Sequence, residues 1–105
     1  MAQNKLKTYE LTVITILSPT STRGKENLKE IEGKIKKIGK IDKKESWGEK
    51  KLAYPIKKNQ NGFYYFFQFN TQPSEIANLD KYLKLNENVI RYLIVISDKN
   101  KRRGN

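Results

Sequence analysis

The sequence predicts an α+β fold in which two helices cover one face of a four-stranded antiparallel sheet. Three observations predict it: four segments have the apolar pattern of strands, two have the period of helices, and their order is β-α-β-β-α-β. The chain has 105 residues, a length typical of one domain. We expect a single domain over residues 1–97, with its core in 7–97, and a flexible basic tail over 98–105.

The first strand and the first helix follow from side-chain periodicity. Residues 7–17 are expected to form a strand because Tyr9, Leu11 and Val13 share one face and β-branched residues dominate the rest. Residues 24–39 are expected to form a helix. Its apolar residues recur at helical spacing and make one stripe: Leu28, Ile31, Ile35 and Ile38.

The middle of the chain reads as a hairpin. Residues 40–56 are expected to form a long strand with a polar middle, and 63–71 a second one. Between them, residues 57–62 end in Asn61-Gly62, a pair that is able to adopt positive φ, so we expect a hairpin loop there.

The strand over 63–71 has six aromatic residues in seven positions. Gln68 and Asn70 share parity with Tyr64 and Phe66, which are therefore expected on the face away from the helices. The opposite parity is expected in the core: Phe63, Tyr65, Phe67 and Phe69.

The last two elements complete the order. Pro73 lies where the first turn of a second helix is expected, and Ile76, Leu79 and Leu83 repeat at helical spacing. Residues 88–97 are expected to form the last strand. Two right-handed crossovers then place the first and third strands in the centre, which is the ferredoxin-like plan.

The residue types exclude several classes of function. The chain has no Cys and no His, which excludes a disulfide framework, a Cys/His zinc site and a Ser-His-Asp triad. The acidic residues are scattered, and no glycine-rich phosphate loop is present. We therefore expect no enzyme activity, no catalytic residue, no metal site, no cofactor and no small-molecule substrate. Apolar runs are too short to span a bilayer, and no membrane partner is expected.

The charge points to a polyanionic partner. Lys and Arg number 22 against 11 Asp and Glu, a net charge of +11, which favours nucleic acid first and an anionic membrane surface second. Arg91 is the one charge inside an otherwise apolar strand. Because burial of that charge would be costly, we expect Arg91 on the open face, where it can contact phosphate.

One stretch is specific enough to suggest a family. Residues 47–57 read Trp-Gly-Glu-Lys-Lys-Leu-Ala-Tyr-Pro-Ile-Lys, and this pattern closely resembles the signature of the bacterial ribosomal protein S6 family. The resemblance covers residues 7–97. Further landmarks agree in the same order: Tyr9-Glu10, Ser18-Pro19, Gly62 before the aromatic strand with Gln68, and Leu85 to Arg91.

The resemblance implies a ferredoxin-like structural protein of the small ribosomal subunit. Members of the family bind the central domain (platform) of 16S ribosomal RNA together with ribosomal protein S18. The family's basic positions map to residues expected to bind RNA: Lys7, Lys50, Lys51, Lys58 and Arg91, with Lys5 added because Thr8 replaces a common basic residue. We expect partner-protein contacts from the edge of the second strand and the open-face aromatics: Trp47, Tyr54, Tyr64 and Phe66. The implied location is the cytoplasmic ribosome or, alternatively, a plastid ribosome.

Two other functions stay open at this point. A module similar to the RNA-recognition motif would read single-stranded RNA by stacking bases on Tyr64 and Phe66, but the match to that motif's signature is partial. A protein-interaction module would bind no RNA at low salt.

Overall fold

The computed structural model describes residues 6–56 and 59–97, and the side chains of these residues apart from 53–60. The expected tail, Lys5, Lys58 and the side chain of Tyr54 lie outside this part of the chain. The elements are β1 (Lys7–Thr15), α1 (Thr22–Ile38), β2 (Gly39–Ile56), β3 (Asn59–Thr71), the short 3-10 helix η1 (Pro73–Glu75), α2 (Ile76–Leu85) and β4 (Val89–Ile96).

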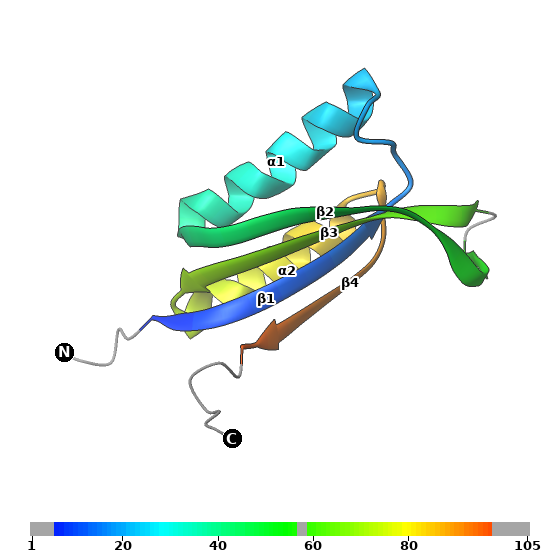
Figure 1. Cartoon of the computed structure of the whole chain (residues 1–105). Helices are drawn as coiled ribbons and strands as arrows, with labels where there is room; N and C mark the ends of the chain where they lie inside the picture. The colour runs from blue at the N-terminus through cyan, green and yellow to red at the C-terminus, as the bar shows by residue number, and fades with distance from the viewer. Residues whose placement is uncertain (1–5, 57–58, 98–105) are drawn as a thin grey trace.

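The strands form one antiparallel sheet in the order β2-β3-β1-β4 (Figure 1). The two central strands are β1 and β3, and each helix connects one strand to the next. This arrangement confirms the predicted ferredoxin-like fold. Among the described residues, neither helix is long and apolar enough to cross a membrane.

The core lies between the helices and one face of the sheet. Alternate residues of β1 and β3 enter it, so the predicted faces of both strands are confirmed. The buried apolar residues are Tyr9, Leu11, Val13, Ile31, Ile35, Tyr65, Phe67, Phe69, Leu79, Leu83 and Val89, with Phe63 partly buried against them. Burial of this set is the main favourable term for folding, because apolar surface leaves water.

Helix α1 begins earlier than expected because Ser21 caps it. The Ser21 hydroxyl accepts a hydrogen bond from the Gly24 amide at 3.0 Å, which satisfies one of the unpaired N–H groups of the first turn. At the other end, the Thr71 hydroxyl donates to the carbonyl of Ile38 at 2.6 Å. The end of the helix is thereby joined to the neighbouring strand.

The predicted hairpin loop over 57–62 is wrong in extent. Strand β3 begins at Asn59, and Gly62 lies inside it, without positive φ. A Cβ at Gly62 would lie 2.4 Å from Cγ2 of Ile14. The glycine therefore allows two strands to pack closely and is not needed for a turn.

Candidate functional site

The candidate site is the sheet face opposite the helices, where side chains form rows across the strands. Tyr64 of β3 lies opposite Ile14 of β1, which in turn lies opposite Arg91 of β4. One row along, Thr12 lies between Phe66 and Leu93 by the same pairing. This face therefore joins aromatic, apolar and cationic residues from separate parts of the sequence.

A bulge in β2 brings Trp47 onto this face. The pairing with β3 shifts between Ser46 and Gly48, and Gly48 has a φ of 84°, which glycine adopts without strain. The Trp47 ring stacks on Phe66 with centroids 5.3 Å apart, and its Nε1 donates to Oε1 of Glu45 at 2.7 Å. Trp47 is still 43% exposed, so the stack leaves part of its aromatic surface open to solvent.

Two cations flank the Tyr64 row, one from each edge strand. Nζ of Lys50 lies 5.8 Å from the centroid of the Tyr64 ring, within reach of a cation–π interaction. Arg91 reaches the same row from β4 and is exposed. The structure therefore brings Lys50 and Arg91 to the same face and the same end of the sheet.

The other predicted RNA contacts lie elsewhere. Lys51 pairs with Asn61 and alternates with Lys50, so it projects from the opposite face of the β2–β3 ladder. Lys7 begins β1, seven residues before Ile14, which is about 23 Å along a strand. Lys7 and Lys51 therefore do not join the cluster around Tyr64.

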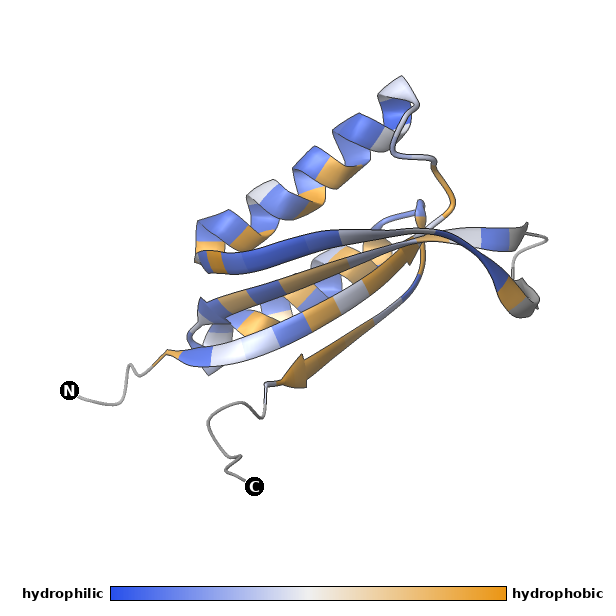
Figure 2. Ribbon diagram, in the orientation of Figure 1, coloured by the Kyte–Doolittle hydropathy of each residue, from blue (hydrophilic) through white to orange (hydrophobic). Residues whose placement is uncertain are grey.

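Sequence reasoning missed two apolar residues of this face. Leu93 and Val95 of β4 are 61% and 41% exposed, and they share the parity of Arg91. Figure 2 shows β4 as a largely hydrophobic strand along one edge of the sheet. The sequence could have identified them, because side chains alternate along a strand and residues 91, 93 and 95 therefore share one face. They extend the apolar surface that Trp47 and Phe66 begin.

A small apolar contact supports the hairpin that carries Lys50. Around Gly62, a Cβ would meet Ile14, Leu52 and Ile90, in order of increasing distance. Leu52 is buried although its neighbours Lys50 and Lys51 are exposed. These side chains surround Gly62 and join the base of the β2–β3 hairpin to β1 and β4, so they help to position Lys50.

The displaced pKa values belong to contacts on the helix side. A hydrogen bond from Lys44 lowers the pKa of Glu32, and the charge of Lys36 acts in the same direction, while burial opposes both. This contact links β2 to α1. A hydrogen bond to Asp80 is the main cause that raises the pKa of Tyr92 to about 12.

The described residues contain no cluster of three or more metal-ligating side chains. The open face instead presents exposed cations beside aromatic and apolar groups. Such a surface can bind phosphate through its cations and a protein through its rings.

Comparison with known proteins gives consistent matches over most of the chain. A family model described as ribosomal protein S6 matches residues 8–96. The chain is 39% identical over 97 residues to the small ribosomal subunit protein bS6 of Clostridioides difficile, covering 88% of this chain and 100% of that relative. It is 38% identical over 89 residues to the bS6 protein of Bacteroides fragilis, covering 82% and 78% of the two chains.

A solved structure shows the same architecture. The crystal structure of 30S ribosomal protein S6 from Thermotoga maritima superposes with a TM-score of 0.79 at 28% sequence identity. The match covers 92% of each chain.

Proposed function

The chain belongs to the ribosomal protein S6 family of the small ribosomal subunit, and from this membership we propose that it binds 16S ribosomal RNA together with ribosomal protein S18. Members of this family are structural ribosomal proteins and not enzymes. The observation that carries the proposal is the composition of the open face, where Lys50 and Arg91 lie beside a half-exposed aromatic stack.

The RNA contacts in this proposal are electrostatic. Lys50 and Arg91 approach one stretch of phosphate backbone from opposite edges of the sheet, and the arginine can form a bidentate contact. Lys51 and Lys7 lie on other surfaces and would contact separate phosphates; Lys5 and Lys58 complete the proposed set. Such contacts recognise the shape of a folded junction, since bases in RNA helices are poorly accessible.

The proposed contact with S18 uses the aromatic part of the same face. Trp47 and Phe66 form its centre, Tyr64 and the newly found Leu93 and Val95 extend it, and Tyr54 is proposed at the β2 edge. Aromatic anchors in a partly apolar patch are typical of the residues that dominate binding energy.

The alternative of base stacking on single-stranded RNA is less favoured by the geometry. Trp47 covers one face of the Phe66 ring, and Lys50 lies over the Tyr64 ring. Both rings therefore already have intramolecular partners on a face that a base would need. We propose docking of a protein partner as the role of these rings.

The salt dependence of RNA binding tests the proposal. With S18 and a central-domain fragment of 16S RNA, Lys50→Gln and Arg91→Gln should each flatten the slope of log K against log salt by about 0.7–0.9. Lys29→Gln, which removes an exposed charge from α1, is the matched control and should leave the slope unchanged. Equal effects from all three variants would show attraction by net charge alone and would contradict the proposed contacts.

The location is tested separately by sedimentation. The protein should sediment with small ribosomal subunits in a sucrose gradient. Recovery only at the top of the gradient would contradict a ribosomal role.

A further inference from the structure

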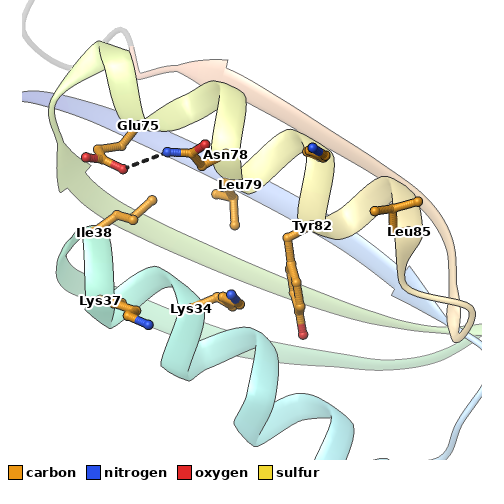
Figure 3. Close-up of a pocket in the computed structure, with 9 residues that line it drawn as sticks. Lys34, Lys37, Ile38, Glu75, Asn78, Leu79, Tyr82 and Leu85 are labelled. Atoms are coloured by element: carbon orange, nitrogen blue, oxygen red, sulfur yellow. Dashed lines mark hydrogen bonds between the residues drawn. The ribbon is translucent and has the colours of Figure 1, made fainter.

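A groove between the two helices lies on the side of the molecule away from the open sheet face. Its volume is about 510 Å³. Figure 3 shows its lining residues, which come from α1, η1 and α2. The residues that matter for its chemistry are Lys34, Lys37, Lys81, Leu79, Tyr82 and Leu85.

The floor and one end of the groove are apolar. Leu79 is buried at its base, and Ile38 of α1 is partly buried beside it. Leu85, the last residue of α2, is 71% exposed. A leucine so exposed at the border of a groove adds little to folding, but it can pack against a bound apolar side chain.

The rim of the groove is cationic. Lys34 and Lys37 come from α1 and Lys81 from α2, and across the described residues none of the three forms a salt bridge. The acid lining the groove is Glu75, at one end, where its Oε1 accepts a hydrogen bond from Asn78 at 3.2 Å. The rim therefore attracts negative charge along most of its length, and Glu75 makes one end of the groove acidic.

Tyr82 forms one wall of the groove, between the two helices. Its ring extends from α2 toward α1 in Figure 3, and Nζ of Lys34 lies 5.2 Å from the ring centroid. Its hydroxyl accepts a hydrogen bond from Asn86 at 3.4 Å. Burial, with the nearby charge of Glu30, raises the pKa of Tyr82 to about 12.

We infer that this groove is a docking site for an acidic amphipathic peptide segment of another protein. Carboxylates of the segment face Lys34, Lys37 and Lys81, while its apolar side chains lie over Leu79 and Leu85. This inference goes beyond the proposed function, since the groove and the open sheet face lie on opposite sides of the sheet and both can be occupied at once.

Charge complementarity favours an acidic peptide over three other ligands: the chain's own C-terminal segment, a second copy of the chain, and RNA. The chain's own C-terminal segment, residues 98–105, has four basic residues and one acidic residue, so the lysine rim repels it. A second copy carries a net charge of +11 and is repelled in the same way. RNA phosphates would leave the exposed Leu85 without a partner and would meet Glu75. An acidic peptide with leucine side chains can pair its carboxylates with the lysines of the rim and pack its leucines against the apolar floor.

Fluorescence anisotropy with the full-length protein tests the inference. The probe is a fluorescein-labelled peptide of Glu-Leu-Leu-Glu repeats, about 12 residues long, which is roughly three helical turns. Replacement of every Glu by Gln, or of every Leu by Ser, gives the two control peptides. A single-stranded RNA of about the same number of nucleotides serves as the competing class of ligand.

Two triple variants of equal net charge separate the groove from general attraction. The groove variant is Lys34→Gln, Lys37→Gln, Lys81→Gln, and the matched control is Lys25→Gln, Lys29→Gln, Lys84→Gln. All six lysines are exposed, and glutamine has a helix propensity close to that of lysine, so both proteins should fold.

We expect the groove variant to bind the acidic peptide about tenfold more weakly, and the control to stay within about twofold of the wild type. Leu85→Ser should also weaken binding, both control peptides should bind poorly, and amide shifts on titration should map to α1 and α2. Equal losses in both triple variants, shifts confined to the sheet, or no peptide binding would overturn the inference. Selective loss of RNA binding in the groove variant would overturn it in favour of a nucleic-acid site.

Discussion

Trp47 and Phe66 stack on the open face with ring centroids 5.3 Å apart and ring planes 10° from parallel. The two residues are brought together by the bulge after Ser46, which moves Trp47 out of the regular pairing of β2 with β3. The hydrogen bond to Glu45 fixes the indole further. A rigid, half-exposed ring of this kind is the usual form of a binding anchor, because little rotamer entropy is lost on docking.

Removal of the Trp47 ring should weaken binding to S18. We expect Trp47→Ala to cost about 2 kcal/mol, or about 30-fold in affinity, while Trp47→Phe should retain most of the binding. Because Trp47 is the single tryptophan, its emission should shift to the blue when the partner buries it. An unchanged emission spectrum on saturation with S18 would show that the stack lies outside the interface.

Two glycine substitutions should have opposite effects on stability. Gly62→Ala places a methyl group 2.4 Å from Cγ2 of Ile14 and should destabilise the protein by about 1–3 kcal/mol through overpacking. Gly33 lies in α1, and a Cβ there would meet nothing within 4 Å, so Gly33→Ala should stabilise by about 0.5–1 kcal/mol. Urea unfolding measures both. A loss at Gly33 as large as that at Gly62 would refute the close-packing explanation.

The link between Thr71 and the end of α1 should be measurable. Thr71 is fully buried and its hydroxyl donates to the Ile38 carbonyl. Thr71→Val keeps the shape but leaves that carbonyl unpaired, and we expect a loss of about 1–3 kcal/mol. Thr12→Val is the control, since the Thr12 hydroxyl makes no hydrogen bond within the described part of the chain and lies half-buried on the open face. Equal thermal stability of the Thr71→Val protein and the wild type would exclude a role for this bond.

The contact of Glu32 with Lys44 and Lys36 should make stability depend on pH. The pKa of Glu32 in the folded protein is below its ordinary 4.5. Its contribution is therefore fully present above pH 4.5 and is lost as the pH falls through the folded pKa. Both lysines are more than half exposed, so we expect a contribution below about 1 kcal/mol.

The comparison of Glu32→Gln with the wild type tests this dependence. The difference in unfolding free energy should be largest near neutral pH and should shrink in acid. Glu49→Gln, an exposed change on β2 outside the described salt bridges, provides the control. A difference for Glu32→Gln that grows below pH 4.5 would contradict the sign of the pKa shift.

The periodicity of apolar residues predicted most of the fold. The wrong boundaries lie where a tertiary contact or a capping hydrogen bond decides where an element begins. The alternation in β3 correctly assigned Tyr65, Phe67 and Phe69 to the core, because alternation depends only on neighbouring residues. Asn61-Gly62 has the composition of a turn. The glycine is needed for a different reason, because any side chain at position 62 would clash with Ile14, a residue distant in sequence. Similarly, α1 begins earlier than predicted because the Ser21 side chain caps it. The pattern of apolar residues contains no information about this capping hydrogen bond.

By itself, the sequence determined the order of the elements, the buried faces of β1 and β3, and the absence of thiol and imidazole chemistry, since these follow from residue type and spacing. The tertiary structure alone decided which candidate residues act together. It placed Lys50 with Arg91 and separated both from Lys7, and it stacked Trp47 on Phe66. Register, bulges and cross-strand contacts join distant segments, and no local pattern encodes the distances they create.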